Sequence, residues 1–143
     1  MNNLLYVYAL CVVALFIKMF AISCYQGFYR IKNKAFKNIE DADFVSVAAR
    51  AAELPQVARA GQAWANDLEN IPLFWVLGGL CVALNAAPEL TLWLFCIFTV
   101  ARILHTAAYL RAIQPWRTVF YTVGIICLLV MAINAAMAAW QHL

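Results

Sequence analysis

The chain has 143 residues, a length that favours one domain, and 66% of its residues are hydrophobic while only 12% are charged. A soluble domain of this size needs a more polar surface, so the composition excludes an ordinary soluble protein and indicates an integral membrane protein. The net charge of +3 is small, and we expect no nucleic acid among the partners.

The five cysteines all lie in apolar segments, with neither a Cys-x-x-Cys pair nor a metal-type spacing to histidine. We interpret them as small apolar packing residues. The sequence therefore predicts no metal site and no disulfide framework.

Four segments are long and apolar enough to cross a hydrocarbon core about 30 Å thick as helices. They cover roughly residues 4–29, 61–87, 90–112 and 116–140. No basic residues precede the first segment, so we interpret it as a retained span and not as a cleaved signal peptide. Helices satisfy the backbone within lipid. The predicted fold is an all-α integral membrane protein, an antiparallel four-helix bundle that forms one domain over residues 1–143.

The connections between these segments predict the orientation in the membrane. The first connection is long and polar, with a short amphipathic piece expected around residues 42–53, whereas the other two are short. Six of the ten basic residues lie in the first connection and two, Arg111 and Arg117, lie in the third. The positive-inside rule places both basic connections in the cytoplasm and both termini on the opposite side. The host membrane is a bacterial inner membrane or an endoplasmic reticulum.

Several ionisable residues lie within or at the edge of these spans, where charge is costly and often functional. They are Lys18, Asp67, Glu69, Arg102 and His105. A pair between Glu69 and Arg102 would hold the bundle together without any further role. Asp67 and Asn70 are expected to point elsewhere, to pairing or capping.

Helical spacing brings more polar groups to the same, cytoplasmic, level. Since each helical residue turns about 100°, these groups share faces: Arg59, Gln62, Asn66 and Glu69 on the second span, Arg102, His105 and Tyr109 on the third, Arg117 and Tyr121 on the fourth, and Arg30 at the end of the first. The surplus of arginine indicates an anionic ligand, and Glu69 suits an ammonium group. The pattern favours a site for a peptide or amino acid. We do not expect His105 to act as a base.

The chain resembles the MAPEG family, the membrane-associated proteins in eicosanoid and glutathione metabolism. The resemblance rests on five elements in this order: IKMF near residue 17, KAFKNIEDA at 34–42, NDLENIPLF at 66–74, ARILHTAAYL at 101–110 and PWRTVFY at 115–121. It implies a homotrimer with three glutathione sites in the subunit interfaces, open to the cytoplasm.

The resemblance also implies roles for individual residues. Those that match glutathione-contacting positions of the family are Arg30, Asn66, Glu69, His105, Tyr109, Arg117 and Tyr121. Arg117 matches the arginine that holds the thiolate, and a guanidinium lowers the pKa of a nearby thiol. Asp41 and Thr118 match positions with a catalytic role in the prostaglandin synthase branch. Gln62 and Ala65 stand where relatives often carry arginine, which predicts either weaker glutathione binding or a different hold on the glutathione carboxylates.

The leading hypothesis is a glutathione-dependent transferase that conjugates hydrophobic electrophiles, with reduction of lipid hydroperoxides as a further reaction. Its expected partners are glutathione, a hydrophobic electrophile or lipid-derived substrate, membrane lipids and two further copies of the chain. A prostaglandin-synthase-like isomerase and a non-catalytic protein that binds lipid or another ligand are the alternatives. A small multidrug exporter is disfavoured, because that class needs an acidic residue in the first span, where this chain has Lys18.

Overall fold

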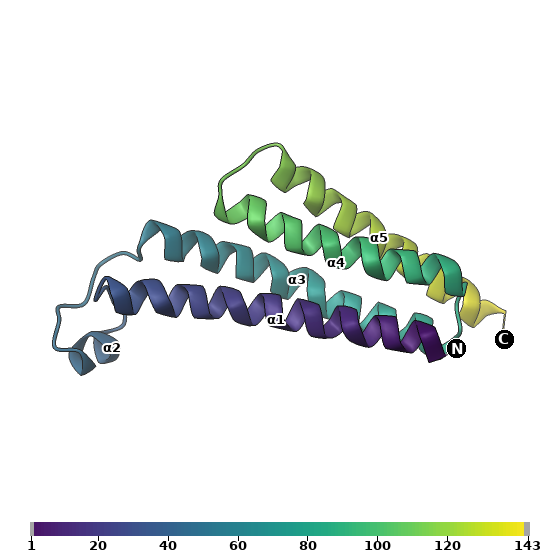
Figure 1. Cartoon of the computed structure of the whole chain (residues 1–143), viewed down its shortest axis with the longest axis horizontal. Helices are drawn as coiled ribbons and strands as arrows, with labels where there is room; N and C mark the ends of the chain where they lie inside the picture. Colours follow the sequence, from purple (N-terminus) through teal and green to yellow (C-terminus); the bar gives the residue numbers. More distant parts are fainter. Residues whose placement is uncertain (1, 142–143) are drawn as a thin grey trace.

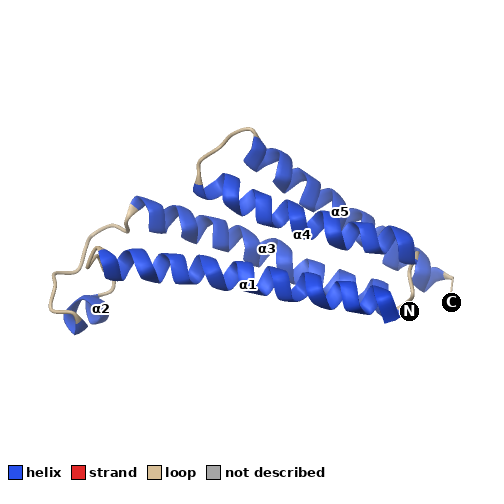
Figure 2. Ribbon diagram, in the orientation of Figure 1, coloured by secondary structure: helices blue, strands red, loops and turns tan. Residues whose placement is uncertain are grey.

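The computed structural model describes residues 2–141, and this part of the chain is helical without any strand (Figure 2). Its helices are α1 (Asn2–Lys32), α2 (Ile39–Phe44), α3 (Pro55–Ala83), α4 (Pro88–Leu110) and α5 (Trp116–Trp140). Proline stands in the first turn of α3 and of α4, where a missing N–H costs nothing.

The four long helices form one elongated bundle (Figure 1). Helix α1 packs against α3 and α4, and α5 packs against α3 and α4. Both ends of the described chain lie at one end of the bundle, together with the α3–α4 connection. The connection that carries α2 lies at the other end, and the α4–α5 connection also points away from the termini. Successive long helices therefore run antiparallel, as predicted.

The long first connection contains a shorter and earlier helix than we predicted. Helix α2 shares only residues 42–44 with the expected amphipathic piece at 42–53, and the rest of that piece is not helical. Glu40 and Asp41 in the first turn favour a helix start here, because acidic side chains complement the helix dipole. Ser46 has a φ of 56°, and this left-handed conformation follows the end of the helix.

Aromatic rings fill the core between α1, α3 and α4. Phe74 stacks on Phe98 with ring centroids 4.6 Å apart, and Phe95 meets Phe74 edge-on at 5.6 Å. Tyr8 closes the cluster from α1, and its hydroxyl donates a hydrogen bond of 2.5 Å to the carbonyl oxygen of Trp75. Burial of these rings fixes the mutual rotation of the three helices, on which the positions of the polar residues depend.

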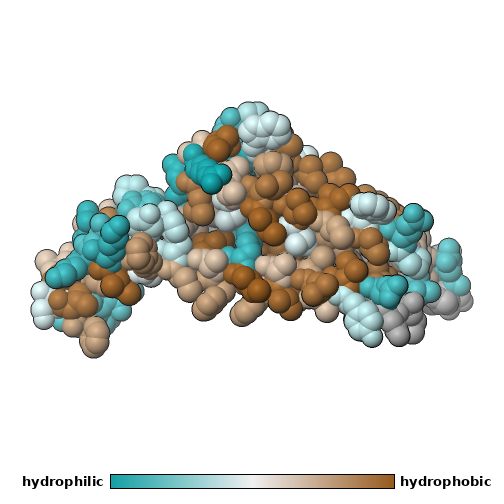
Figure 3. Space-filling view, viewed as in Figure 1, coloured by the Kyte–Doolittle hydropathy of each residue, from teal (hydrophilic) through white to brown (hydrophobic). Residues whose placement is uncertain are grey.

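Within the described residues, three helices are long and apolar enough to cross a membrane, namely α1, α4 and α5. Hydrophobic side chains cover much of the outer surface of the bundle (Figure 3). Helix α3 is equally long, but Asn66, Asp67, Glu69 and Asn70 make its first half polar. An all-α fold with membrane-length helices is therefore confirmed, while the number of four spans stays a prediction.

A close helix contact at Gly78 gives a test of this packing. A Cβ atom at Gly78 would lie 2.7 Å from a ring carbon of Tyr8 and 3.1 Å from one of Phe95. The Tyr8 ring is held by its hydrogen bond, so Gly78→Ala should destabilise the protein by about 1–3 kcal/mol. The measurement is thermal unfolding in detergent.

Gly27→Ala is the matched control, since nothing lies within 4 Å of its added Cβ. It should leave stability unchanged or raise it by up to about 1 kcal/mol, because alanine favours helix over glycine. Equal melting temperatures for the two variants would contradict the packing described here.

Candidate functional site

A polar hollow lies between α3, α4 and α5, at the end of the bundle away from the termini. Its volume is about 250 Å³. The residues that line it are Asn66, His105, Tyr109, Arg117, Thr118 and Tyr121. The structure thus brings together five of the residues predicted to contact glutathione and two of those predicted to be catalytic, Thr118 and Arg117, which belongs to both sets.

Arg117 provides the positive charge of this hollow. Its guanidinium carbon lies 4.7 Å from the centre of the Tyr109 ring, a cation–π contact that holds the side chain against α4. Within residues 2–141 Arg117 forms no salt bridge. A guanidinium without a carboxylate partner is suited to bind an anion.

The side chains of α4 form one wall of the hollow. His105 is only 2% exposed, and its ring lies 5.6 Å from that of Tyr109 and 6.1 Å from that of Tyr121. Its Nδ1 atom has no hydrogen-bond partner among the described residues. The hydroxyl of Tyr109 donates to the Oε1 atom of Gln62 at 3.3 Å. An aromatic and amide wall of this kind is suited to orient a ligand by hydrogen bonds.

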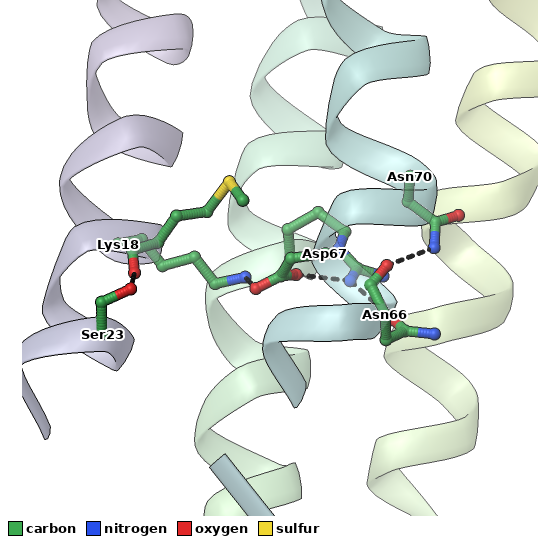
Figure 4. A network of polar contacts seen from close by, with 7 residues as sticks. Lys18, Ser23, Asn66, Asp67 and Asn70 are labelled. Carbon is green, nitrogen blue, oxygen red and sulfur yellow. Dashed lines mark hydrogen bonds and ion pairs between the residues drawn. The ribbon is translucent and has the colours of Figure 1, made fainter. Parts of the chain in front are cut away.

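A buried ion cluster lies inside the bundle (Figure 4), and it includes Asn66, which also lines the hollow. The Asp67 carboxylate joins two cations: Lys18 of α1 bonds its Oδ2 atom, and Arg102 Nη2 of α4 donates to its Oδ1 atom at 2.5 Å. The same Nη2 atom donates to Asn66 Oδ1 at 2.7 Å. Asn70 Nδ2 donates to the backbone oxygen of Asn66 at 2.7 Å. The cluster therefore ties three helices together at the level of the hollow.

The predicted pair between Glu69 and Arg102 is wrong, because Asp67 is the partner of Arg102. Two residues that are two positions apart on a helix are rotated by about 200°, so their side chains lie on nearly opposite sides of it. Only one of these two acidic residues can therefore face the bundle. Asp67 is fully buried, whereas Glu69 is exposed on the outside of α3. The expectation of pairing or capping is confirmed for Asp67, whereas Asn70 donates to the backbone of its own helix.

Two further candidate residues, Arg30 and Asp41, lie apart from this hollow. They line a second hollow of about 170 Å³ together with Phe36, Lys37, Asn38 and Glu53. Arg30 Nη2 and Nε bond Glu53 Oε2 at 2.6 and 3.2 Å, and this guanidinium holds the pKa of the Glu53 carboxyl below its usual value. No sequence pattern points to Glu53, because it lies in a connection without helical periodicity.

An apolar groove of about 400 Å³ runs between α4 and α5, the helices that also carry most of the polar hollow. Its lining is almost entirely hydrophobic, formed by Trp93, Cys96, Ile97, Val100, Ala101, Leu104, Val119, Phe120 and Val123. Val119 and Phe120 directly follow Thr118 in the chain. A hydrophobic molecule in this groove would therefore lie close to the polar site.

Comparison with known proteins identifies the family. The model of the MAPEG family matches residues 8–137. The chain belongs to the MAPEG family. Human prostaglandin E synthase is 34% identical over 137 residues, covering 95% of this chain and 90% of the relative. Human microsomal glutathione S-transferase 1 is 36% identical over 112 residues, covering 75% of this chain and 72% of the relative.

The resemblance found in the sequence is thereby confirmed. Membership of the MAPEG family and the three apolar helices together make this chain an integral membrane protein. The family match includes the polar half of α3, the His105 region of α4 and the start of α5. The polar hollow therefore lies entirely within the part of the chain that this MAPEG protein shares with its family.

The ion cluster predicts that removal of two neighbouring carboxylates, those of Asp67 and Glu69, changes the stability of the protein very differently. Asp67→Ala leaves Lys18 and Arg102 buried without a counter-charge, so it should cost about 3–5 kcal/mol of stability. Glu69→Ala removes an exposed carboxylate two residues away and should change stability by less than about 0.5 kcal/mol. Thermal unfolding of both variants in detergent measures the difference, and equal losses would contradict the assignment of Asp67 as the buried counter-ion.

Proposed function

We propose that this MAPEG protein is a glutathione-dependent membrane transferase that conjugates hydrophobic electrophiles, with reduction of lipid hydroperoxides as a further reaction. One observation carries the proposal: Arg117, which has no salt-bridge partner within residues 2–141, shares a hollow with Asn66, Tyr109 and Tyr121 beside an apolar groove. The name of the related microsomal glutathione S-transferase supports the same ligand.

The residues of the hollow fit glutathione chemically. Glutathione is an anionic tripeptide and supplies a thiol, which reacts as the thiolate. Arg117 would hold the thiolate, since a guanidinium favours the charged form of a nearby sulfur. His105, Asn66 and the tyrosine hydroxyls would orient the peptide by hydrogen bonds. Positioning and charge stabilisation at a preformed site are the main sources of rate enhancement in such a design.

Thr118 and Asp41 complete the proposed set of catalytic residues. Thr118 lines the hollow next to Arg117, so its hydroxyl is placed to donate a hydrogen bond to the developing charge. Asp41 lies in the second hollow with Arg30. Its part in catalysis therefore depends on an arrangement that brings the two hollows together.

A homotrimer of four-span subunits supplies that arrangement. Glu69 is exposed and Arg30 lies in the second hollow, so both are outside the first hollow of their own protomer. A neighbouring copy would bring Arg30 and Asp41 to it, with α3 as the additional span. In this proposal the interface site lies on the cytoplasmic side and the termini opposite, an orientation that the basic connections support. Mass measurement of the detergent-solubilised protein tests the trimer.

A prostaglandin-synthase-like isomerase is the second candidate. The observation that favours it is the match to human prostaglandin E synthase over 95% of this chain, together with Asp41 and Thr118. A non-catalytic protein that binds lipid or another ligand is the third, favoured by Gln62 and Ala65 in place of arginine. Both would use the same hollow and groove, so the reaction must be measured.

The proposal predicts that Arg117→Ala abolishes the ultraviolet absorbance of bound glutathione thiolate. It should also lower conjugation of a chlorinated nitrobenzene by about 10²–10³-fold, because the group that stabilises the reacting charge is lost. Arg111→Ala is the matched control, since Arg111 is exposed and does not line the hollow. The purified wild-type protein in detergent provides the reference.

Three outcomes separate the candidates. Wild type that neither binds nor conjugates glutathione would contradict the proposal. Binding without conjugation would favour the non-catalytic protein. Glutathione-dependent turnover of a prostaglandin endoperoxide, without conjugation, would favour the isomerase.

A further inference from the structure

Arg102 bridges the buried ion cluster and the wall of the polar hollow. It is fully buried and does not line the hollow itself. A single nitrogen, Nη2, donates both to Asp67 Oδ1 and to Asn66 Oδ1, at 2.5 and 2.7 Å. Of these two acceptor residues, only Asn66 lines the hollow. Arg102 therefore reaches the candidate site through one hydrogen bond to an amide.

That hydrogen bond determines which end of the Asn66 amide is offered to a ligand. An amide carries an acceptor oxygen and a donor nitrogen, and its orientation follows from the hydrogen bonds it makes. Because Oδ1 is bound to Arg102, the Nδ2 group is the end that remains, and it has no acceptor among the described residues. The amide nitrogen of Asn66 lies on the side away from Asp67 (Figure 4).

We infer that Arg102 is a positioning residue for the glutathione site, acting through Asn66. It holds the amide so that Nδ2 donates hydrogen bonds to an acceptor of the ligand, a carboxylate or peptide carbonyl oxygen. This inference rests on the proposed function. It adds to that proposal one residue outside the hollow, Arg102. It also specifies that the ligand group bound by Asn66 is a hydrogen-bond acceptor.

The ion cluster explains why this position is fixed. Asp67 neutralises Arg102, and the other oxygen of the same carboxylate is bound to Lys18 of α1. The aliphatic part of Arg102 lies against α5, with its Cδ atom 3.5 Å from the position of a Cβ at Gly124. The guanidinium is thus bonded to two residues of α3, while α5 lies beside the aliphatic part of the same side chain. A buried charged donor of this kind orients its acceptor strongly.

Lys18 provides a matched control, because it contacts Asp67 but not Asn66. Arg102→Met leaves the neutral pair Lys18–Asp67, and Lys18→Met leaves the neutral pair Arg102–Asp67. Both variants therefore remove one of two buried cations from the same carboxylate. Only the first should disturb the Asn66 amide.

The test is steady-state conjugation by the full-length protein in detergent, with glutathione and the electrophile varied separately. Arg102→Met should raise the KM for glutathione about tenfold or more, while the KM for the electrophile stays within about twofold. Lys18→Met should keep the KM for glutathione within about twofold of wild type. An equal rise in both variants would overturn the inference.

A double variant tests whether Arg102 acts through Asn66. If it does, Asn66→Ala combined with Arg102→Met should have the same KM for glutathione as Asn66→Ala alone, since contacting residues are not additive. A further rise equal to the effect of Arg102→Met would overturn the inference.

If Arg102→Met does not fold, Asn66→Asp gives an independent test. Its carboxylate can still accept from Arg102, but it presents an oxygen to the hollow where wild type presents donors. The KM for glutathione should exceed that of Asn66→Ala, and a wild-type value would overturn the inference. Wild type without glutathione binding would contradict the proposed function and this inference with it, whereas an active wild type with the wrong variant pattern contradicts the inference alone.

Discussion

One buried carboxylate organises the polar half of this membrane protein. Asp67 accepts from Lys18 on one oxygen and from Arg102 on the other, and so joins α1, α3 and α4. A single unpaired charge at this depth would be prohibitively costly, and removing one member of a buried cluster is far more harmful than its net contribution suggests. The helices can therefore adopt only a rotation that keeps the three groups together, and that rotation places the candidate site.

The polar residues of the bundle divide into two sets with different surroundings. The inner set, Lys18, Asp67 and Arg102, is buried and largely satisfied by its own members. The outer set faces the hollow with Arg117 available for an anion. Asn66 belongs to both, since it accepts from Arg102 and also lines the hollow. Structural and ligand-binding charges thus remain distinct although they lie side by side.

Hydropathy and helical spacing predicted much of this arrangement. Long apolar runs identified the helices, and the spacing of Arg102, His105 and Tyr109 placed them on one face of α4. The spacing of Arg117 and Tyr121 likewise predicted that both would face one site. Such patterns can be recognised in a sequence because each face of a helix is buried or solvent-exposed along its length, so residues of one kind recur at the helical period.

What the sequence left undetermined depends on tertiary packing. Spacing alone does not say which side of α3 faces the bundle, so a pair between Glu69 and Arg102 was considered, whereas in the structure Asp67 is the partner of Arg102. The bond from Arg30 to Glu53 joins α1 to an irregular connection, and no periodicity predicts such a contact. Arg30 and Asp41 line a separate hollow of the chain, and helical spacing does not predict how far that hollow lies from the first.

A structure of the protein in lipid nanodiscs with glutathione tests the central claim most directly. The account predicts a trimer in which the glutathione sulfur lies against the Arg117 guanidinium and a carboxylate or carbonyl oxygen accepts from Asn66 Nδ2. Glutathione bound elsewhere, with its sulfur remote from Arg117, would contradict the account.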